Sequence, residues 1–269
     1  MPGREDAIAA IGRATLHAVD VVRDVWRLFK DIAFWLFVAP WKRQRAGVRW
    51  ESVVEQGVRI GWDAIPIVVL INLFVGMISA LQSASLLKRF GQLLLVANAV
   101  ALSTTRELAP LLTAIIVAGR SGSAFTAEIG SMKMAEEVDA LSTMGLNPTR
   151  FLIVPRVLAM AIAVPLLTLL ADFMGIFGGW LVAVTVVDLG SWQYLRHTAD
   201  AIDMGDVMRG LTKSCVFGGI IATVGCYLGV HVEGGAEGVG RSTTNSVVVS
   251  IFLVIFANLV FTSFFYVIE

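Results

Sequence analysis

The sequence predicts an all-α protein that crosses a membrane about five times, and three observations indicate this fold class. First, 57% of the 269 residues are hydrophobic and only 16% are charged, whereas a soluble domain carries about 25% charged residues. Second, apolar runs recur that are long enough for a helix to cross the hydrocarbon core, which takes about 20 residues. Third, Lys and Arg gather in alternate segments between these runs, as in membrane proteins with a fixed orientation.

Five apolar runs are the predicted spans. They cover residues 65–87, 90–118, 157–187, 211–230 and 247–268. The first and the last contain no charge, whereas Arg106 and Glu107 interrupt the second, Asp172 the third and Lys213 the fourth. The third run exceeds the usual length of a span, so it needs a tilt or a kink near Gly175 and the two glycines that follow.

The distribution of basic residues predicts the orientation. If the N-terminus is cytoplasmic, most of the 21 Lys and Arg residues fall on the cytoplasmic side, as the positive-inside rule requires. Five spans then place the C-terminus on the opposite side. Acidic and basic residues are equal in number, so the charge indicates no nucleic-acid partner.

Residues 1–60 form a predicted region of their own, ahead of a transmembrane domain over residues 61–269. Apolar residues recur at steps of three and four from Ile8 to Phe29, and Trp35 and Trp41 precede a basic cluster. This pattern is typical of a helix that lies in the membrane interface. A helix packed on the protein's own cytoplasmic face is the alternative.

A polar stretch between the second and third spans, "TAEIGSMKMAEEVDALSTMGLNP" (residues 126–148), predicts a helix on the cytoplasmic side. Thr126 is the expected N-cap, with Glu128 in the first turn, and Gly145 followed by Asn-Pro supplies a stop. Four residues at helical spacing share one face: Met134, Val138, Leu141 and Gly145. The spacing fits both a connector packed against the membrane face and a helix docked in a groove of a soluble partner.

The charges inside the predicted spans need partners, because each costs about 2.5–3.5 kcal/mol at the centre of a membrane. Adjacent helical residues point about 100° apart, so Arg106 and Glu107 are expected to meet different groups. Lys213 is the candidate partner of Glu107, and Asp172 is the candidate partner of Arg106. The four charges either clamp the helices together or hold the phosphate of a polar-headed substrate.

Three segments resemble the MlaE/YrbE family, the permease subunits of MCE-associated ABC lipid transporters. They are "LSTTRELAPLLTAIIVAGRSGSAFTAEIGSMKMAEEVDALSTMGLNP", "PRVLAMAIAVPLLTLLADFMGIFGG" and "GGAEGVGRSTTNSVV", within a resemblance that covers roughly residues 60–269. It implies a homodimer in the bacterial inner membrane that encloses a lipid cavity and moves phospholipids between the inner and outer membranes. The implied partners are a separate ABC ATPase, which binds ATP and Mg, a periplasmic MCE-domain protein and possibly a small cytoplasmic subunit.

The resemblance also implies functional residues. The substrate-binding residues are expected to be Ser79, Gln82, Leu86, Leu87, Phe90, Arg106, Glu107, Leu108, Lys213 and Asn258. Residues 127–145 would form the coupling helix that contacts the ATPase, through Glu128, Met134, Glu136, Glu137, Val138, Leu141 and Gly145. Some relatives carry an acidic residue at the position of Asn258, and this chain lacks that charge.

The periplasmic C-terminus follows from the five spans. The cargo implied by the resemblance is a phospholipid or, as in some relatives, a sterol.

Three other interpretations compete with a transporter permease. A lipid-modifying membrane enzyme would use Glu107 as general base, but the chain has no obvious nucleophile or metal-binding pattern. A channel or a purely structural anchor is a further alternative, but a channel would need a polar stripe along several spans, and the few charges here are isolated. The stretch from Gly235 to Ser242 imitates a nucleotide-binding P-loop but lacks its Lys, so we expect a cytoplasmic turn there with Ser242 or Thr243 capping the last span. No cofactor is expected in this chain.

Overall fold

The computed structural model describes Arg23, Lys30 and residues 50–268. Most of the predicted interfacial helix, with Trp35 and Trp41, lies outside these described residues. Within them every regular element is a helix, and five segments are long and apolar enough to cross a membrane: Trp50–Phe90, Leu95–Met134, Thr149–Thr185, Met204–Val230 and Gly235–Ile268. Each overlaps one predicted span, so the all-α fold class and the five spans are confirmed.

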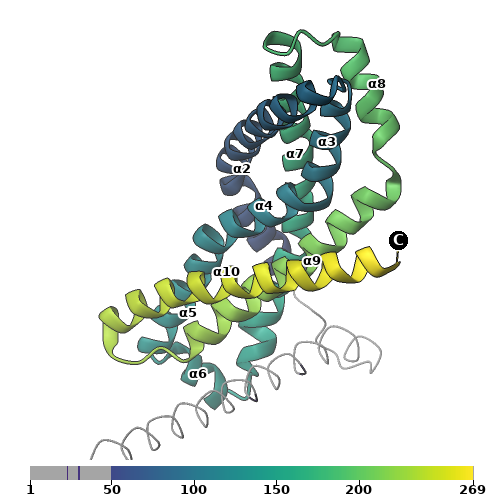
Figure 1. Ribbon diagram of the computed structural model, residues 1–269. Coiled ribbons are helices and arrows are strands. Elements are labelled where there is room, and N and C mark those ends of the chain that lie inside the picture. Colours follow the sequence, from purple (N-terminus) through teal and green to yellow (C-terminus); the bar gives the residue numbers. More distant parts are fainter. Residues whose placement is uncertain (1–22, 24–29, 31–49, 269) are drawn as a thin grey trace, which may run out of the picture.

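The helices follow one another with short connections (Figure 1). They are α2 (Trp50–Leu87), η2 (Lys88–Phe90), α3 (Leu95–Ser103), η3 (Thr104–Leu108), α4 (Ala109–Val117), η4 (Ala118–Gly122), α5 (Ser123–Met134), α6 (Glu137–Thr143), η5 (Thr149–Ile153), α7 (Val154–Thr185), α8 (Ser191–Ala201), α9 (Met204–Val230) and α10 (Gly235–Ile268). The segments η3, η4 and η5 are π-helical. The boundary placed at residue 60 falls inside α2, so residues 50–60 extend the first spanning helix.

Helices α2 and α7 approach each other through glycines. A Cβ atom on Gly76 would overlap the carbonyl oxygen of Gly175, and one on Gly178 would overlap that of Leu73. Small residues of this kind let helix backbones pack closely in membranes. Helix α7 runs through its glycines as one element, so these residues serve the contact with α2.

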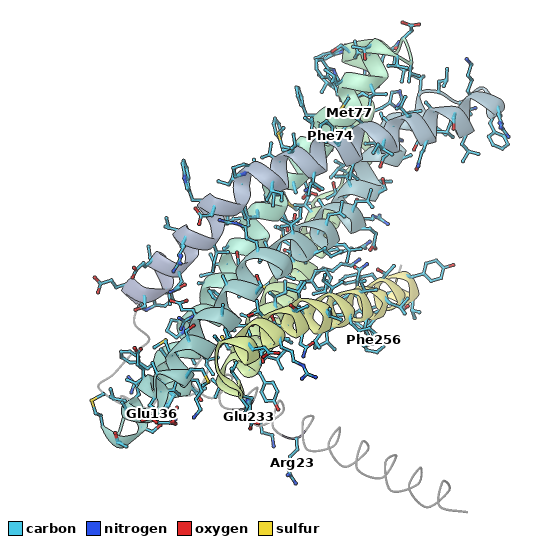
Figure 2. All side chains as sticks on the ribbon, turned by 90° about the vertical axis from the view of Figure 1, so that its left-hand side faces the viewer. Arg23, Phe74, Met77, Glu136, Glu233 and Phe256 are labelled. Atoms are coloured by element: carbon cyan, nitrogen blue, oxygen red, sulfur yellow. The ribbon has the colours of Figure 1, made fainter. Side chains whose placement is uncertain are left out.

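The buried core lies between α2, α4, α5, α7 and α9. Its members include Val68, Ala114, Ile129, Met160 and Phe217. The last helix, α10, covers the outside of this core: only 11% of its most apolar stretch is buried, against 56% for α9. Figure 2 shows α10 along one side of the bundle, with Phe256 pointing outward.

The predicted helix over residues 127–145 is broken in two. Helix α5 continues directly from the second span, and α6 begins after Glu136, whose φ of 59° is left-handed. Thr126 is no cap, because it is buried within α5 and its hydroxyl donates to the carbonyl oxygen of Gly225 at 3.0 Å. The helix begins earlier than predicted because residues 118–130 pack against α9 instead of leaving the bundle.

The predicted stop after α6 is confirmed. Gly145 has a φ of 75°, its N–H donates to the carbonyl oxygen of Ser142 at 3.1 Å, and the N–H of Leu146 donates to that of Leu141 at 3.0 Å. This pair of bonds defines a Schellman motif, in which glycine adopts the left-handed conformation at least cost. The Asn147 side chain then accepts from the N–H of Thr149 at 2.9 Å and starts the next helical segment.

The last span begins earlier than predicted. Gly234 and Gly235 have positive φ values of 89° and 75° and form the turn, and α10 starts at Gly235. Ser242 and Thr243 therefore lie inside the helix, and the Thr243 hydroxyl donates to the carbonyl oxygen of Val239 at 2.6 Å. The prediction of a cap at these residues was wrong, because their hydroxyls bond within the helix instead.

Candidate polar site between spans two, four and five

A π-helical turn in the second span shapes the candidate site. Thr104–Leu108 adopts this geometry between α3 and α4, and π-turns inside helices are rare and frequently found at functional sites. The turn carries both charges of the span, Arg106 and Glu107. It also offers the backbone carbonyl oxygen of Arg106 to a side chain of α9, Lys213, at 3.1 Å.

Glu107 binds groups from two other spans. Its Oε1 accepts from the Lys213 ammonium at 2.6 Å and from the Thr262 hydroxyl at 2.9 Å, and its Oε2 accepts from the Asn258 amide at 3.0 Å. Lys213 lies on α9, and the other two residues lie on α10. The predicted pair of Glu107 and Lys213 is thus confirmed, and Asn258 joins it.

Lys213 is buried, with 1% of its surface exposed, and all three of its N–H donors have acceptors. Besides Glu107 and the Arg106 carbonyl, it donates to the Thr262 hydroxyl at 3.0 Å. A buried charge is tolerated when it is paired and fully hydrogen-bonded. The ammonium group therefore joins the second, fourth and fifth spans at one point.

Arg106 points to a different partner from the predicted one. Its Nε donates to the Asp206 carboxylate at 2.7 Å, and Asp206 also closes the capping box of α9 by accepting from the backbone N–H of Asp203 at 3.2 Å. The predicted pairing with Asp172 was wrong. Asp172 lies in α7, where it is buried and its Oδ1 has no hydrogen-bond partner among the described residues.

Lys213 is buried at the centre of the site, whereas the edge of the site is exposed at the surface. The side chains of Arg106 and Glu107 are 36% and 35% exposed, and they reach the surface beside α10. On its outer face (Figure 2) that helix exposes large apolar side chains, among them Phe256 and Leu259. The arrangement places charged groups next to an uncovered apolar face, which suits an amphipathic ligand with a charged head.

The predicted substrate-binding residues form two groups in the chain. Arg106, Glu107, Lys213 and Asn258 come together, with Leu108 half-buried in the same π-turn. The other five lie on α2 and η2: Ser79, Gln82, Leu86, Leu87 and Phe90. Figure 2 shows α2 and α10 on different sides of the bundle. Leu87 packs against a buried cluster with Ala80 and Val96, whereas Gln82, Leu86 and Phe90 are exposed.

Comparison with known proteins places the chain in a family. Residues 53–264 match the family described as Permease MlaE. This chain belongs to the MlaE permease family. It is 41% identical, over 95% of its length and 96% of the relative's, to a probable ABC transporter permease protein of Rickettsia prowazekii. It is 39% identical to a probable ABC transporter permease protein of Synechocystis sp., over 77% of this chain and 79% of the relative.

A plant relative is also similar. The chloroplastic protein trigalactosyldiacylglycerol 1 of Arabidopsis thaliana is 36% identical over 81% of this chain and 63% of the relative. The MlaE family consists of ABC transporter permeases, so the chain is a membrane subunit of a transporter and not an enzyme. An ABC permease works with an ATPase partner, and the P-loop-like stretch is part of α10 in this permease.

The predicted coupling residues of the permease lie at one end of the bundle, where Figure 2 labels Glu136. Val138 is buried and Leu141 packs against the same core. Met134, Glu136, Glu137 and Gly145 are exposed. The exposed apolar surface of this tip also includes Met144 and Leu146, which sequence reasoning missed because they flank the glycine stop.

Glu128 faces inward from α5. Its Oε2 lies 3.0 Å from the guanidinium of Arg156 on α7, and its Oε1 lies 4.0 Å from that of Arg59 on α2. Arg156 is buried, donates to the carbonyl oxygen of Leu152 at 2.8 Å and covers the ring of Phe125. Glu128 therefore links α5 to both α7 and α2 inside the permease.

Sequence reasoning missed four residues of these clusters: Asp203, Asp206, Thr262 and Arg156. Asp203 and Asp206 have the spacing of a capping box ahead of an apolar run, which is the signal that could have found them. Thr262 follows Asn258 by one helical turn, so a search for polar residues on that face would have included it.

Proposed function

We propose that this permease moves phospholipids between the inner and outer membranes of a bacterium, as a homodimer that works with an MCE-domain protein. The observation that supports it is the polar site at Glu107, whose charges reach the surface beside the exposed apolar face of α10. A phospholipid has a charged head and two apolar chains, and this surface offers complements to both. The name of the Arabidopsis relative, which refers to trigalactosyldiacylglycerol, also supports a lipid as cargo.

The homodimer follows from the cost of exposed charge in a membrane. Arg106 and Glu107 are about one-third exposed, and charged groups in spans persist where they face a bundle interior or a wet cavity. A second copy that faces α10 would convert this edge into the wall of a chamber. The lipid head would then meet Arg106, and its chains would contact residues such as Phe256 and Leu259.

The ATPase would dock on the tip formed by α5 and α6. Its exposed residues Met134, Met144 and Leu146 offer apolar contacts, and Glu136 and Glu137 offer charge. ATP and Mg would bind to that partner. We place this tip and the N-terminus in the cytoplasm and the C-terminus in the periplasm, which leaves the opposite end for the MCE-domain protein, with a small cytoplasmic subunit as a possible further partner.

The homodimer is tested by disulfide cross-linking in membranes. In a background in which the exposed Cys215 is replaced by Ser, Phe256→Cys on α10 is expected to cross-link two copies. Leu166→Cys, an equally exposed position on α7, is the matched control and is expected to stay monomeric. The absence of a cross-link at Phe256, or equal cross-linking at both positions, contradicts the proposed interface.

Transport is tested with the permease, its ATPase and the MCE-domain protein in liposomes that contain a fluorescent phospholipid. We expect ATP-dependent transfer, and Glu107→Gln is expected to reduce it. For the docking tip, Met144→Arg is expected to abolish co-purification of the ATPase. Met204→Arg, at an exposed methionine that begins α9, is the control and is expected to keep it. Transfer that needs no ATP, or that prefers a sterol to the phospholipid, contradicts the proposal.

A further inference from the structure

A second polar site lies between α2 and the segment formed by η4 and α5. It is a cavity of ≈ 160 Å³. Its polar lining residues are Gln56, Arg59, Asp63, Arg120, Ser121 and Glu128, with the ring of Phe125 beside them. None of them belongs to the cluster around Glu107.

The ion pairs of this cavity leave positive charge available. Arg120 lies 3.0 Å from Asp63. Glu128 lies 3.0 Å from Arg156, a buried residue that does not line the cavity. Arg59 is only 4.0 Å from Glu128, and its side chain is 68% exposed. Three guanidinium groups therefore surround two carboxylates, and guanidinium groups bind phosphate oxygens well.

The same cavity also offers acceptors for a hydrogen-bond donor. The Oε1 atom of Gln56 is buried and has no hydrogen-bond partner among the described residues, which is costly for a polar atom. The carboxylate of Asp63 is partly exposed one helical turn from Arg59. An ammonium group that carries N–H bonds can donate to acceptors of this kind, whereas a quaternary ammonium has no N–H to donate.

An exposed apolar stripe continues from the cavity along α2. Starting one turn after Asp63, it comprises Ile67, Leu70, Phe74, Ile78 and Leu81, at steps of three and four residues and with exposures of 44–52%. Figure 2 shows Phe74 on the outer surface of α2. The stripe is about 21 Å long at 1.5 Å per residue, which exceeds the roughly 15 Å hydrocarbon depth of one leaflet. An acyl chain fits along it.

We propose that the cavity and this stripe together bind one membrane phospholipid whose head carries a phosphate and an N–H-bearing ammonium. The phosphate contacts Arg59 and Arg120, the ammonium contacts Asp63 and Gln56, and an acyl chain follows the stripe on α2. The inference deepens the proposed function, on which it rests, by naming a site where a lipid of one leaflet is held before it reaches the cluster around Glu107. A water-soluble ligand would leave the stripe unused.

The experiment measures which lipid the full-length permease retains. Delipidated protein is equilibrated with equal amounts of phosphatidylethanolamine, phosphatidylcholine and phosphatidylglycerol of the same acyl chains, and the bound lipid is counted by native mass spectrometry. We expect about two- to five-fold more phosphatidylethanolamine than phosphatidylcholine, because a part-exposed polar contact contributes up to about 1 kcal/mol. Equal retention of these two lipids by the unaltered protein overturns the inference without any variant.

Three variants sharpen this measurement. Gln56→Leu and Asp63→Asn are expected to bring the ratio of phosphatidylethanolamine to phosphatidylcholine toward one, and Arg59→Gln is expected to lower the retention of both. Asp139→Asn removes an exposed charge on α6 that is paired with Lys133 and does not line the cavity. It is the matched control and is expected to change nothing. A ratio that stays the same in Gln56→Leu and Asp63→Asn overturns the assignment of the headgroup contacts.

A photo-reactive benzoylphenylalanine at position 74 tests the stripe. A cross-link to a lipid supports the inference, and a cross-link to a second copy of the chain contradicts it. The transport assay separates the two proposals. ATP-driven transfer without headgroup preference at this site refutes the site alone, whereas the expected preference without any ATP-driven transfer refutes the proposed function and leaves the site in place.

Discussion

Two ionic clusters of this permease differ in how completely their groups are paired. Around Glu107 every donor of Lys213 has an acceptor and each carboxylate oxygen accepts at least one bond, so the charged groups are paired, while the amide oxygen of Asn258 has no partner among the described residues. Around the cavity at Asp63 one ion pair is stretched to 4.0 Å and the Gln56 oxygen has no partner among the described residues. Closely paired buried charges hold helices together, whereas a long, exposed ion pair retains bonding capacity for a ligand. Substitutions in the first should therefore change stability, and those in the second should change binding.

The largest effect is expected for Lys213→Met. It leaves the Glu107 carboxylate without its buried partner, and breaking such a pair costs about 3 kcal/mol. The measurement is unfolding of the permease in detergent micelles, followed by its midpoint. The double substitution with Glu107→Gln is the control and is expected to recover part of the loss. If the single and the double variant lose the same stability, the ion pair does not hold the helices together.

A smaller loss is expected for Arg156→Met, at about 2 kcal/mol. Arg156 is buried, but its partner Glu128 is 39% exposed and keeps Arg59 nearby, so water and Arg59 compensate in part. The same unfolding measurement applies, with Glu128→Gln added to the variant as the control. A loss larger than that of Lys213→Met would reverse the ranking of the two clusters.

Asp206→Asn is expected to cost about 1 kcal/mol. It weakens the bond to Arg106 and the capping box at the start of α9 while keeping the shape of the side chain. Asp200→Asn is the control, because Asp200 makes only a long, exposed pair with Arg196. Equal stability of the two variants would show that the bond between Arg106 and Asp206 does not stabilise the permease.

The smallest change in stability is expected for Asp63→Asn, within about 0.5 kcal/mol, because the pair with Arg120 is exposed and such pairs contribute little. The same variant is expected to alter the lipid ratio described above. An altered lipid ratio together with unchanged stability would be the clearest difference between the cavity and the cluster around Glu107. A large loss of stability without a change in the lipid ratio would show that the pair with Arg120 is structural.

The sequence predicts the spans well because a membrane helix needs a long apolar run, and that signal is local. It also predicts the pair of Glu107 and Lys213, because a charge inside a span must find a partner and few candidates exist. Asp206 was missed for a related reason. It lies ahead of the apolar run that starts at residue 211, and the helix begins there before the hydrophobic signal does.

Two other features depend on tertiary packing, which no local pattern reveals. Nothing in the sequence marks Glu136 for a left-handed conformation, so the break between α5 and α6 could not be predicted. The start of α5 was misplaced because Thr126 looks like a cap, although α9 buries it. The division at residue 60 and the assignment of individual substrate and coupling residues stay predictions.

The ammonium of Lys213 has a mechanical consequence. Because it is bonded at once to the π-turn of span two and to side chains of spans two and five, these three helices cannot slide past one another without breaking a saturated junction. The close contacts of Gly76 with Gly175 and of Gly178 with Leu73 hold α2 and α7 together as a second unit. Gly218 of α9 also packs against the backbone of Met160 on α7, so the two units are in close contact. Labels placed on α2 and α10 would show whether their separation changes when the partner ATPase hydrolyses ATP.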